Sequence, residues 1–228
     1  MNTKSFYRLC ISLVIGLAIT ACSNDEGSQA DSQSPVVPDE SGMYHYLLNL
    51  NCNTPSYDEE ATTRSIVRTW DNAASIIVRF KSGTKFITGT ATYSSSDKLW
   101  SIVTSESLPV ISGEGTCELY YFAGASTKDA NVALTESTPC YYTTSATYVR
   151  PSEASVAIQA SLGRKTWRLR FKGTSGTSIT LPKNDNEIKY FSAFNGQTGN
   201  FTDSQKDITL TVHNTGYTPY IYGTFVKL

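Results

Sequence analysis

Apolar and polar side chains alternate with a period of two residues along much of this chain. After Met43, the side chains that would project to one side of an extended backbone are Tyr44, Tyr46, Leu48 and Leu50. Those that would project to the other side are His45, Leu47, Asn49 and Asn51. The pattern returns where Trp167, Leu169 and Phe171 alternate with Arg168, Arg170 and Lys172. Such alternation indicates β-strands with one face toward the core and the other toward water.

Further segments have the β-branched and aromatic composition of strands. They are 76–80, 88–93, 99–103, 116–122, 132–134, 156–162, 178–181, 189–193, 208–213 and 220–226. Gly, Asn, Asp and Ser separate them about every 8–12 residues, which is the rhythm of a β-sandwich. No segment has the apolar stripe of a helix. We therefore predict an all-β fold.

The number of strands suggests two β-sandwich domains in tandem, because it exceeds what one small sandwich needs. The best boundary is the polar stretch Arg150-Pro151-Ser152-Glu153, which divides the strand region into an N-terminal domain, 43–150, and a C-terminal domain, 151–228. A single larger sandwich is the alternative.

The N-terminal segment has the features of an export signal. Lys4 and Arg8 precede the apolar run 9–18, which is shorter than the ~20 residues of a membrane span. The run ends in Ile19-Thr20-Ala21-Cys22, which resembles a bacterial lipobox. The resemblance implies a signal peptide over 1–21 and a lipid anchor of palmitate-type acyl chains at Cys22. The alternative is an ordinary signal peptide in which Cys22 is incidental.

The next segment, 22–42, is rich in Ser, Asp, Gln and Pro, so we expect a flexible tether that buries no core. It begins with Asn24-Asp25-Glu26, which resembles the acidic signal that sends some lipoproteins of anaerobes to the outer face. Plain linker polarity is the alternative. Together with Cys22, this predicts an outer-membrane protein on the cell surface.

Charge and cysteine content narrow the range of partners. The formal net charge is -1 and no basic stripe is visible, so we expect no nucleic-acid partner. Besides Cys10 and Cys22, the chain holds Cys52, Cys117 and Cys140 without a CxxC pair, so we expect no metal site. These three thiols are either free and buried or form one disulfide, for which Cys117–Cys140 closes the shorter loop.

Nothing in the sequence singles out catalytic residues, so we expect no enzyme and no cofactor. The two histidines are His45 and His213, and neither has a triad-like neighbourhood in sequence.

The aromatic residues could serve either packing or ligand binding. Most tyrosines should pack across strands, yet Tyr141 and Tyr220 could contact a glycan. We expect the three tryptophans, Trp70, Trp100 and Trp167, in the core.

Several phrases together resemble the fimbrillin-like lipoproteins of anaerobic Gram-negative bacteria, which are related to type V pilins. They are Thr62-Thr63-Arg64-Ser65 followed by Trp70-Asp71 and Ile76-Ile77-Val78, Gly89-Thr90-Ala91-Thr92-Tyr93 followed by Leu99-Trp100, Gly115-Thr116-Cys117-Glu118-Leu119-Tyr120-Tyr121-Phe122, and Leu169-Arg170-Phe171-Lys172-Gly173-Thr174-Ser175-Gly176-Thr177. The likeness covers most of residues 44–228. It implies two transthyretin-like sandwiches and a structural or adhesive role in fimbriae.

The resemblance also implies a mechanism. A protease would cut between Arg64 and Ser65, the first strand would leave, and a strand from another pilin subunit would replace it. Tyr44, Tyr46, Leu48 and Leu50 are then the inward residues of the displaceable strand. Alternatively, Arg64 is an ordinary loop residue and the intact protein is an anchor, tip or accessory subunit. The rival function is a glycan-binding surface lipoprotein of a nutrient-uptake system.

Overall fold

The structure is a computed structural model that describes residues 36–54, 66–67, 70–183 and 188–225. Every helix or strand assigned within these ranges is a β-strand, so the all-β prediction is confirmed. Within the same ranges, no helix is long and apolar enough to cross a membrane.

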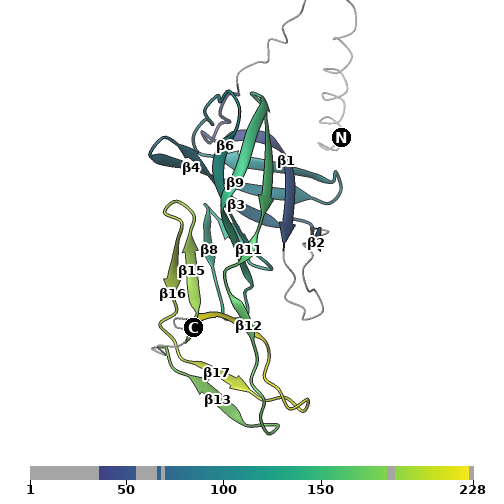
Figure 1. Cartoon of the computed structure of the whole chain (residues 1–228), viewed down its shortest axis with the longest axis vertical. Helices are drawn as coiled ribbons and strands as arrows, with labels where there is room; N and C mark the ends of the chain where they lie inside the picture. The colour runs from purple at the N-terminus through teal and green to yellow at the C-terminus, as the bar shows by residue number, and fades with distance from the viewer. Residues whose placement is uncertain (1–35, 55–65, 68–69, 184–187, 226–228) are drawn as a thin grey trace, which may run out of the picture. The chain divides into compact units, whose positions relative to one another are not determined.

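Seven of the described strands form a closed ring, a β-barrel that occupies the first two thirds of the described chain (Figure 1). Around the ring they are β1 (Tyr44–Thr54), β5 (Leu99–Thr104), β4 (Lys85–Ser94), β3 (Ser75–Ser82), β6 (Gly115–Phe122), β9 (Cys140–Ser152) and β10 (Ser155–Ser161). The pairing of β10 with both β9 and β1 closes the ring. Closure leaves none of these strands as a free sheet edge.

The pairing that joins β1 to β10 is parallel, whereas the other six pairings of the ring are antiparallel. A parallel pair cannot be linked by a tight turn. These two strands therefore come from segments far apart in sequence. Two short strands extend the sheet beyond the ring: β2 (Ile66–Val67) pairs with the end of β1, and β11 (Gly163–Arg164) pairs with β9.

Strand β3 is buried on both faces, which explains its unbroken apolar sequence. Ile76, Val78 and Phe80 point into the barrel core and are fully buried. Ile77, on the opposite face, belongs to a second core that also contains Phe194. Sequence alternation fails here because the outer face of the barrel is covered by another part of the chain.

The covering part is a four-stranded sheet. In spatial order its strands are β16 (Asn200–Asp203), β15 (Phe191–Asn195), β8 (Asn131–Ala133) and β7 (Thr127–Lys128). The turn between β15 and β16 reaches the barrel: the backbone oxygen of Gly196 accepts a hydrogen bond from Thr88 at 3.2 Å, and that of Gln197 accepts one from Arg79 at 3.3 Å.

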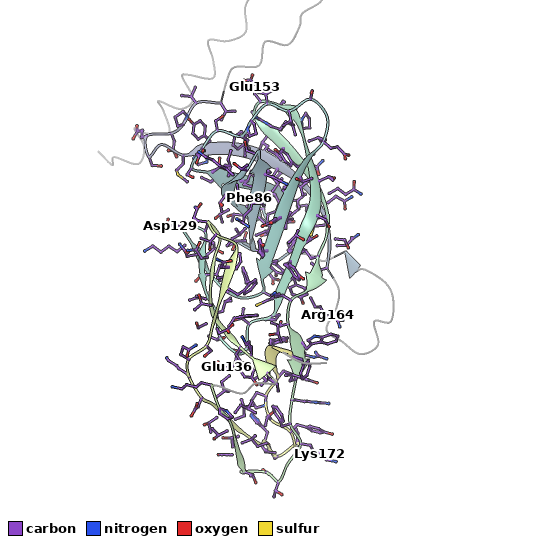
Figure 2. All side chains as sticks on the ribbon, turned by 60° about the vertical axis from the view of Figure 1, so that its left-hand side comes forward. Phe86, Asp129, Glu136, Glu153, Arg164 and Lys172 are labelled. Carbon is purple, nitrogen blue, oxygen red and sulfur yellow. The ribbon has the colours of Figure 1, made fainter. Side chains whose placement is uncertain are left out.

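Arg79 is buried at this junction, 7% exposed, and forms an ion pair with Glu118 of β6. Its guanidinium also lies over the ring of Phe86, 4.1 Å from the centroid (Figure 2 labels Phe86). A buried charge needs such partners, because removing it from water is otherwise costly. Arg79, held in this way by the barrel, links the β15–β16 turn to it through the hydrogen bond to Gln197.

The remaining strands form two small sheets around a third core, which contains Ile208, Leu210 and Ile221. One sheet has the order β12 (Trp167–Leu169), β18 (Ile221–Phe225), β14 (Ile188–Lys189). The other pairs β13 (Ser178–Leu181) with β17 (Ile208–Thr211).

The arrangement does not confirm two sandwiches in tandem. The boundary predicted between 150 and 151 falls inside β9, and β10 beyond it pairs with β9 and β1 of the same ring. The polar stretch 150–153 therefore belongs to the connection between two barrel strands. Its Pro and charged residues had the composition of a linker, and composition alone does not distinguish a linker from a hairpin turn.

Candidate functional site

The first strand of the barrel is the element on which the fimbrillin-like interpretation depends. Strand β1 pairs with β5 from Tyr44 to Leu48 and with β10 from Leu47 to Asn53. Its alternation is as predicted: Tyr46 and Leu48 are buried in the barrel core, while Tyr44 and Leu50 are half-buried and pack against it. The inward face continues to Cys52 and Thr54. The predicted orientation of the four residues is confirmed.

A hydrogen-bonded group of three residues holds β1 in place from inside. The backbone N–H of Leu108 donates to the hydroxyl of Tyr46 at 2.9 Å. Arg150 lies over the Tyr46 ring, 5.2 Å from its centroid, and donates from Nη1 to the backbone oxygen of Leu108 at 2.6 Å. Tyr46 thus joins β1 to β9 and to the segment that follows β5.

The start of β1 is fixed by Asp39. Its carboxylate accepts hydrogen bonds from the Ser41 hydroxyl at 2.6 Å and from the backbone N–H of Met43 at 2.9 Å, and it lies 2.7 Å from Nε2 of His45. These hydrogen bonds, that of Ser41 foremost, hold the pKa of Asp39 below its usual range. His45 is exposed, as the sequence predicts.

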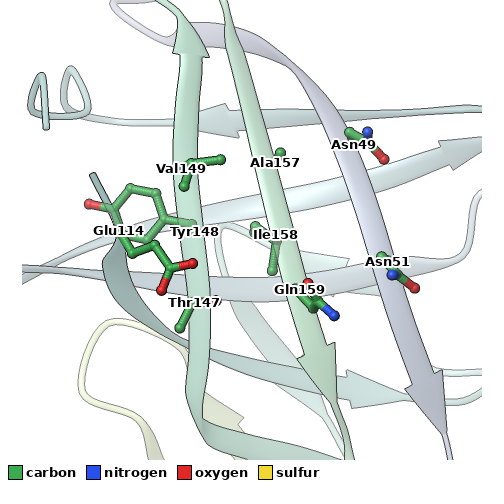
Figure 3. A pocket seen from close by; sticks show the side chains of 9 residues that line it. All are labelled: Asn49, Asn51, Glu114, Thr147, Tyr148, Val149, Ala157, Ile158 and Gln159. Atoms are coloured by element: carbon green, nitrogen blue, oxygen red, sulfur yellow. The ribbon is translucent and has the colours of Figure 1, made fainter. Parts of the chain in front are cut away.

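A hollow of about 210 Å³ with a mixed polar and apolar lining lies along β9, β10 and β1 (Figure 3). Figure 3 shows β9, β10 and β1 side by side, with Asn49 and Asn51 projecting from β1 and Gln159 from β10. The hollow is also lined by Glu114 and Thr147. These groups supply the polar, amide-rich part of its lining.

A larger, mainly apolar hollow of about 690 Å³ also lies beside β1 and shares Asn49 and Ala157 with the first. Trp70, Tyr93 and Trp100 line it, with Trp100 at 5.1 Å from Trp70 and 5.3 Å from Tyr93 between ring centroids. At its rim, Leu47 and Leu99 are 62% and 56% exposed. Leu47 was correctly predicted to point away from the core.

The remaining predicted site residues are either outside the described residues or differ in exposure. Cys22, Arg64 and Ser65 lie outside the described residues, so lipidation and processing stay predictions. The expectation that Tyr141 contacts a glycan is wrong, because its side chain is 1% exposed and stacks on Tyr121 at 5.7 Å. The register of β6 with β9 directs both rings into the barrel. Tyr220 is 38% exposed and stays a candidate.

Sequence reasoning missed the residues that lock β1. Leu108 and Arg150 carried no signal, because their contacts with Tyr46 join segments about 60 and 100 residues apart along the chain. Trp70 and Trp100 do pack with the barrel core, but Trp167 is 52% exposed. Of this alternating series, only Leu169 of β12 and Phe171 beyond it pack against the third core.

Cys52, Cys117 and Cys140 are buried thiols that form no disulfide with one another, which decides between the two alternatives for these three residues. Burial raises the pKa of each thiol to about 12. At neutral pH they are protonated and therefore poor nucleophiles. In the part of the chain that the structure describes, no three His, Cys, Asp or Glu residues gather in a metal-binding group.

No protein-family model, no curated protein and no solved structure matches the chain.

Proposed function

We propose that this chain is a fimbrillin-like surface lipoprotein, anchored through Cys22, that acts in fimbria assembly or anchoring by exchange of its first strand. The observation that carries the proposal is the position of β1 in the ring. It lies between β5 and β10, and the chain connects it directly to neither. Removing β1 would therefore leave the other six strands paired in an unbroken series.

The vacated position would bind a replacement strand strongly. Two backbone ladders and the inward pockets of Tyr46, Leu48 and Cys52 would lose their partners. Each large apolar side chain that refills such a pocket contributes roughly 1.5–3 kcal/mol. Backbone pairing supplies affinity, and alternate side chains supply specificity.

The proposal does not need the two transthyretin-like sandwiches that the resemblance implies, because one barrel with a replaceable strand suffices. It also makes two fates exclusive for one molecule. The intact protein keeps β1 and its lipid. A protein cut after Arg64 loses both and is free to accept a strand from another subunit.

Limited digestion with an arginine-specific protease tests strand exchange. We expect a cut between Arg64 and Ser65, identified by N-terminal sequencing, and then a ladder of oligomers on mildly denaturing gels. A synthetic peptide of residues 43–54 should suppress the ladder, because it refills the position of β1. The same peptide with Leu48→Asp should not suppress it, because a carboxylate would enter the barrel core.

The Arg64→Gln variant is the matched control, and it should give neither the cut nor the ladder. Strand exchange is rejected if the cut protein remains monomeric with the N-terminal fragment bound, or if the ladder forms equally in Arg64→Gln. The anchor is tested separately by mass spectrometry of the mature protein from membranes. An unmodified Cys22 would remove the anchor while leaving the test of strand exchange intact.

A further inference from the structure

A row of three cations begins in strand β12 and continues into the segment that follows it. Arg168 belongs to β12, Arg170 and Lys172 come after its end at Leu169, and the guanidinium groups of Arg168 and Arg170 both lie over the ring of Tyr220. Arg168 pairs with Tyr222 of β18, and Lys172 forms an isolated bridge with Tyr217. Tyr220 lies between these two tyrosines along the chain. We name this surface the arginine–tyrosine face; it consists of Arg168, Arg170, Lys172, Tyr217, Tyr220 and Tyr222.

The guanidinium groups of this face are stacked on tyrosine rings. Arg168 lies 4.3 Å from the ring centroid of Tyr220, and Arg170 lies 4.2 Å from that of Tyr217 and 5.0 Å from that of Tyr220. Arg170, Lys172 and Tyr220 are exposed. Stacking orders the guanidinium of Arg170 in advance, and its planar N–H edge has the geometry for a bidentate contact with an anion.

Positive charge is concentrated here although the whole chain is nearly neutral. Residues 163–182 hold five cations, Arg164, Lys165, Arg168, Arg170 and Lys172, and no Asp or Glu; residues 208–228 also contain no Asp or Glu. Lys189, in the same sheet, is paired with Asp203 at 3.0 Å. Among the described residues, Arg170 and Lys172 have no carboxylate within ion-pair distance.

We infer that the arginine–tyrosine face binds an anionic polysaccharide, one whose sugars carry carboxylate or sulfate groups. The three cations follow one another at every second residue along the chain, which suits a ligand with repeated negative charges. Their planar edges match carboxylate or sulfate oxygens, and the tyrosine hydroxyls add partners for sugar hydroxyls. Figure 2 labels Lys172 at one end of this row.

Two features favour a glycan over other polyanions. Guanidinium groups already cover faces of Tyr217 and Tyr220, so these rings offer less of the stacking surface that single-stranded nucleic acids use. No residue of the face lines either hollow beside β1 or the one formed by Tyr190 and Asp207, so none of these three hollows could hold the apolar anchor of an acidic peptide bound to the face. The inference goes beyond strand exchange and uses no residue of β1.

Binding should be measured by isothermal titration calorimetry with the intact chain and defined polymers. The probes are polygalacturonate for carboxylate, dextran sulfate for sulfate, unmodified dextran as the neutral backbone and a single-stranded oligonucleotide as the other polyanion. We expect one or both anionic glycans to bind and dextran not to bind. Which of the two binds more tightly identifies the anionic group.

The variant Arg168→Gln/Arg170→Gln should weaken glycan binding by about tenfold or more, because it removes charge-assisted hydrogen bonds. The matched control, Lys81→Gln/Lys128→Gln, removes two exposed cations outside the face and should stay within about twofold. Arg170→Lys keeps the charge but loses the bidentate edge, so it should also weaken binding. If the double variant does not fold, Lys172→Gln at the exposed end of the row provides the same comparison.

The inference is overturned if neither anionic glycan binds, if the control variant loses as much affinity as the variant of the face, or if the oligonucleotide binds more tightly than both glycans. Arg170→Lys binding at full strength would reduce the face to unspecific charge attraction and would also overturn it. Each of these results leaves the digestion test of strand exchange unaffected, so the two proposals fail separately.

Discussion

The backbone amide of Leu108 donates a hydrogen bond to the hydroxyl of Tyr46 across 2.9 Å, in a part of the barrel that water does not reach. This contact ties the first strand to a segment 62 residues away. The strand that we propose to be exchangeable is thus held by a specific side-chain hydrogen bond as well as by its backbone pairing with β5 and β10.

The variant Tyr46→Phe should lower the free energy of unfolding by about 1–3 kcal/mol, because it leaves the buried Leu108 amide without its acceptor. Urea unfolding followed by fluorescence measures the change. Tyr220→Phe, which alters a hydroxyl at the surface, is the control and should change stability by less than about 0.5 kcal/mol. Equal losses in the two variants would contradict a structural role of the Tyr46 hydroxyl.

Shortening a side chain on the inward face of β1 should cost much more stability than shortening one on its outward face. Leu48 is 4% exposed, and Leu48→Ala should cost about 2–5 kcal/mol through the cavity it leaves. Leu47 is 62% exposed, and Leu47→Ala should be nearly neutral. Chemical denaturation of both variants distinguishes the faces. A larger loss for Leu47→Ala would mean that the register of β1 differs by one residue.

The turn that fixes the β15–β16 hairpin to the barrel should tolerate no side chain at Gly199. Its φ is +75°, and an added Cβ would meet the guanidinium of Arg79, which is held by Glu118 and Phe86. Gly199→Ala should therefore combine backbone strain of about 1–2 kcal/mol with overpacking of about 1–3 kcal/mol.

Gly176→Ala isolates the strain alone, because Gly176 has a φ of +82° with open space around its Cβ position. The difference between the two variants in thermal or urea unfolding reports the clash with Arg79. Equal destabilisation would show that Arg79 moves away freely, contrary to a rigid junction.

Stability should fall as the pH rises from about 9 toward about 12. Burial raises the pKa of Cys52, Cys117 and Cys140 from 9.0 to about 12 in the folded state. Above pH 9 the unfolded chain loses these protons first, so deprotonation favours unfolding, by up to about 1.4 kcal/mol per pH unit for each thiol. Below pH 9 both states keep the protons, and the thiols contribute no pH dependence.

Urea unfolding in reducing buffer at several pH values measures this slope, and Cys52→Ala should make it shallower. Accessibility gives an independent readout: the folded protein at pH 8 should react slowly with a thiol reagent and the unfolded protein rapidly. Rapid labelling of the folded protein would contradict the burial of the thiols.

Local sequence pattern determined the strands and, for β1, which side chains face inward. Two-residue periodicity is a property of the backbone, so it is readable wherever one face of a strand meets water, as along Tyr44–Leu50. The alternation predicted for residues 167–172 holds only in part, because Leu169 and Phe171 pack against the third core while Trp167 is exposed. Periodicity does not state which strand lies beside which, or what covers the second face.

Those questions were decided by tertiary structure. The parallel pairing of Leu48 with Val156 closes the barrel across the expected domain boundary, and the β15–β16 hairpin buries Ile77 on the outer face of β3. The same long-range packing buries Tyr141, leaves Trp167 exposed and brings Leu108 and Arg150 to Tyr46. The contacts among them join distant segments, so they depend on the closure of the whole sheet and cannot be recognised in the local sequence.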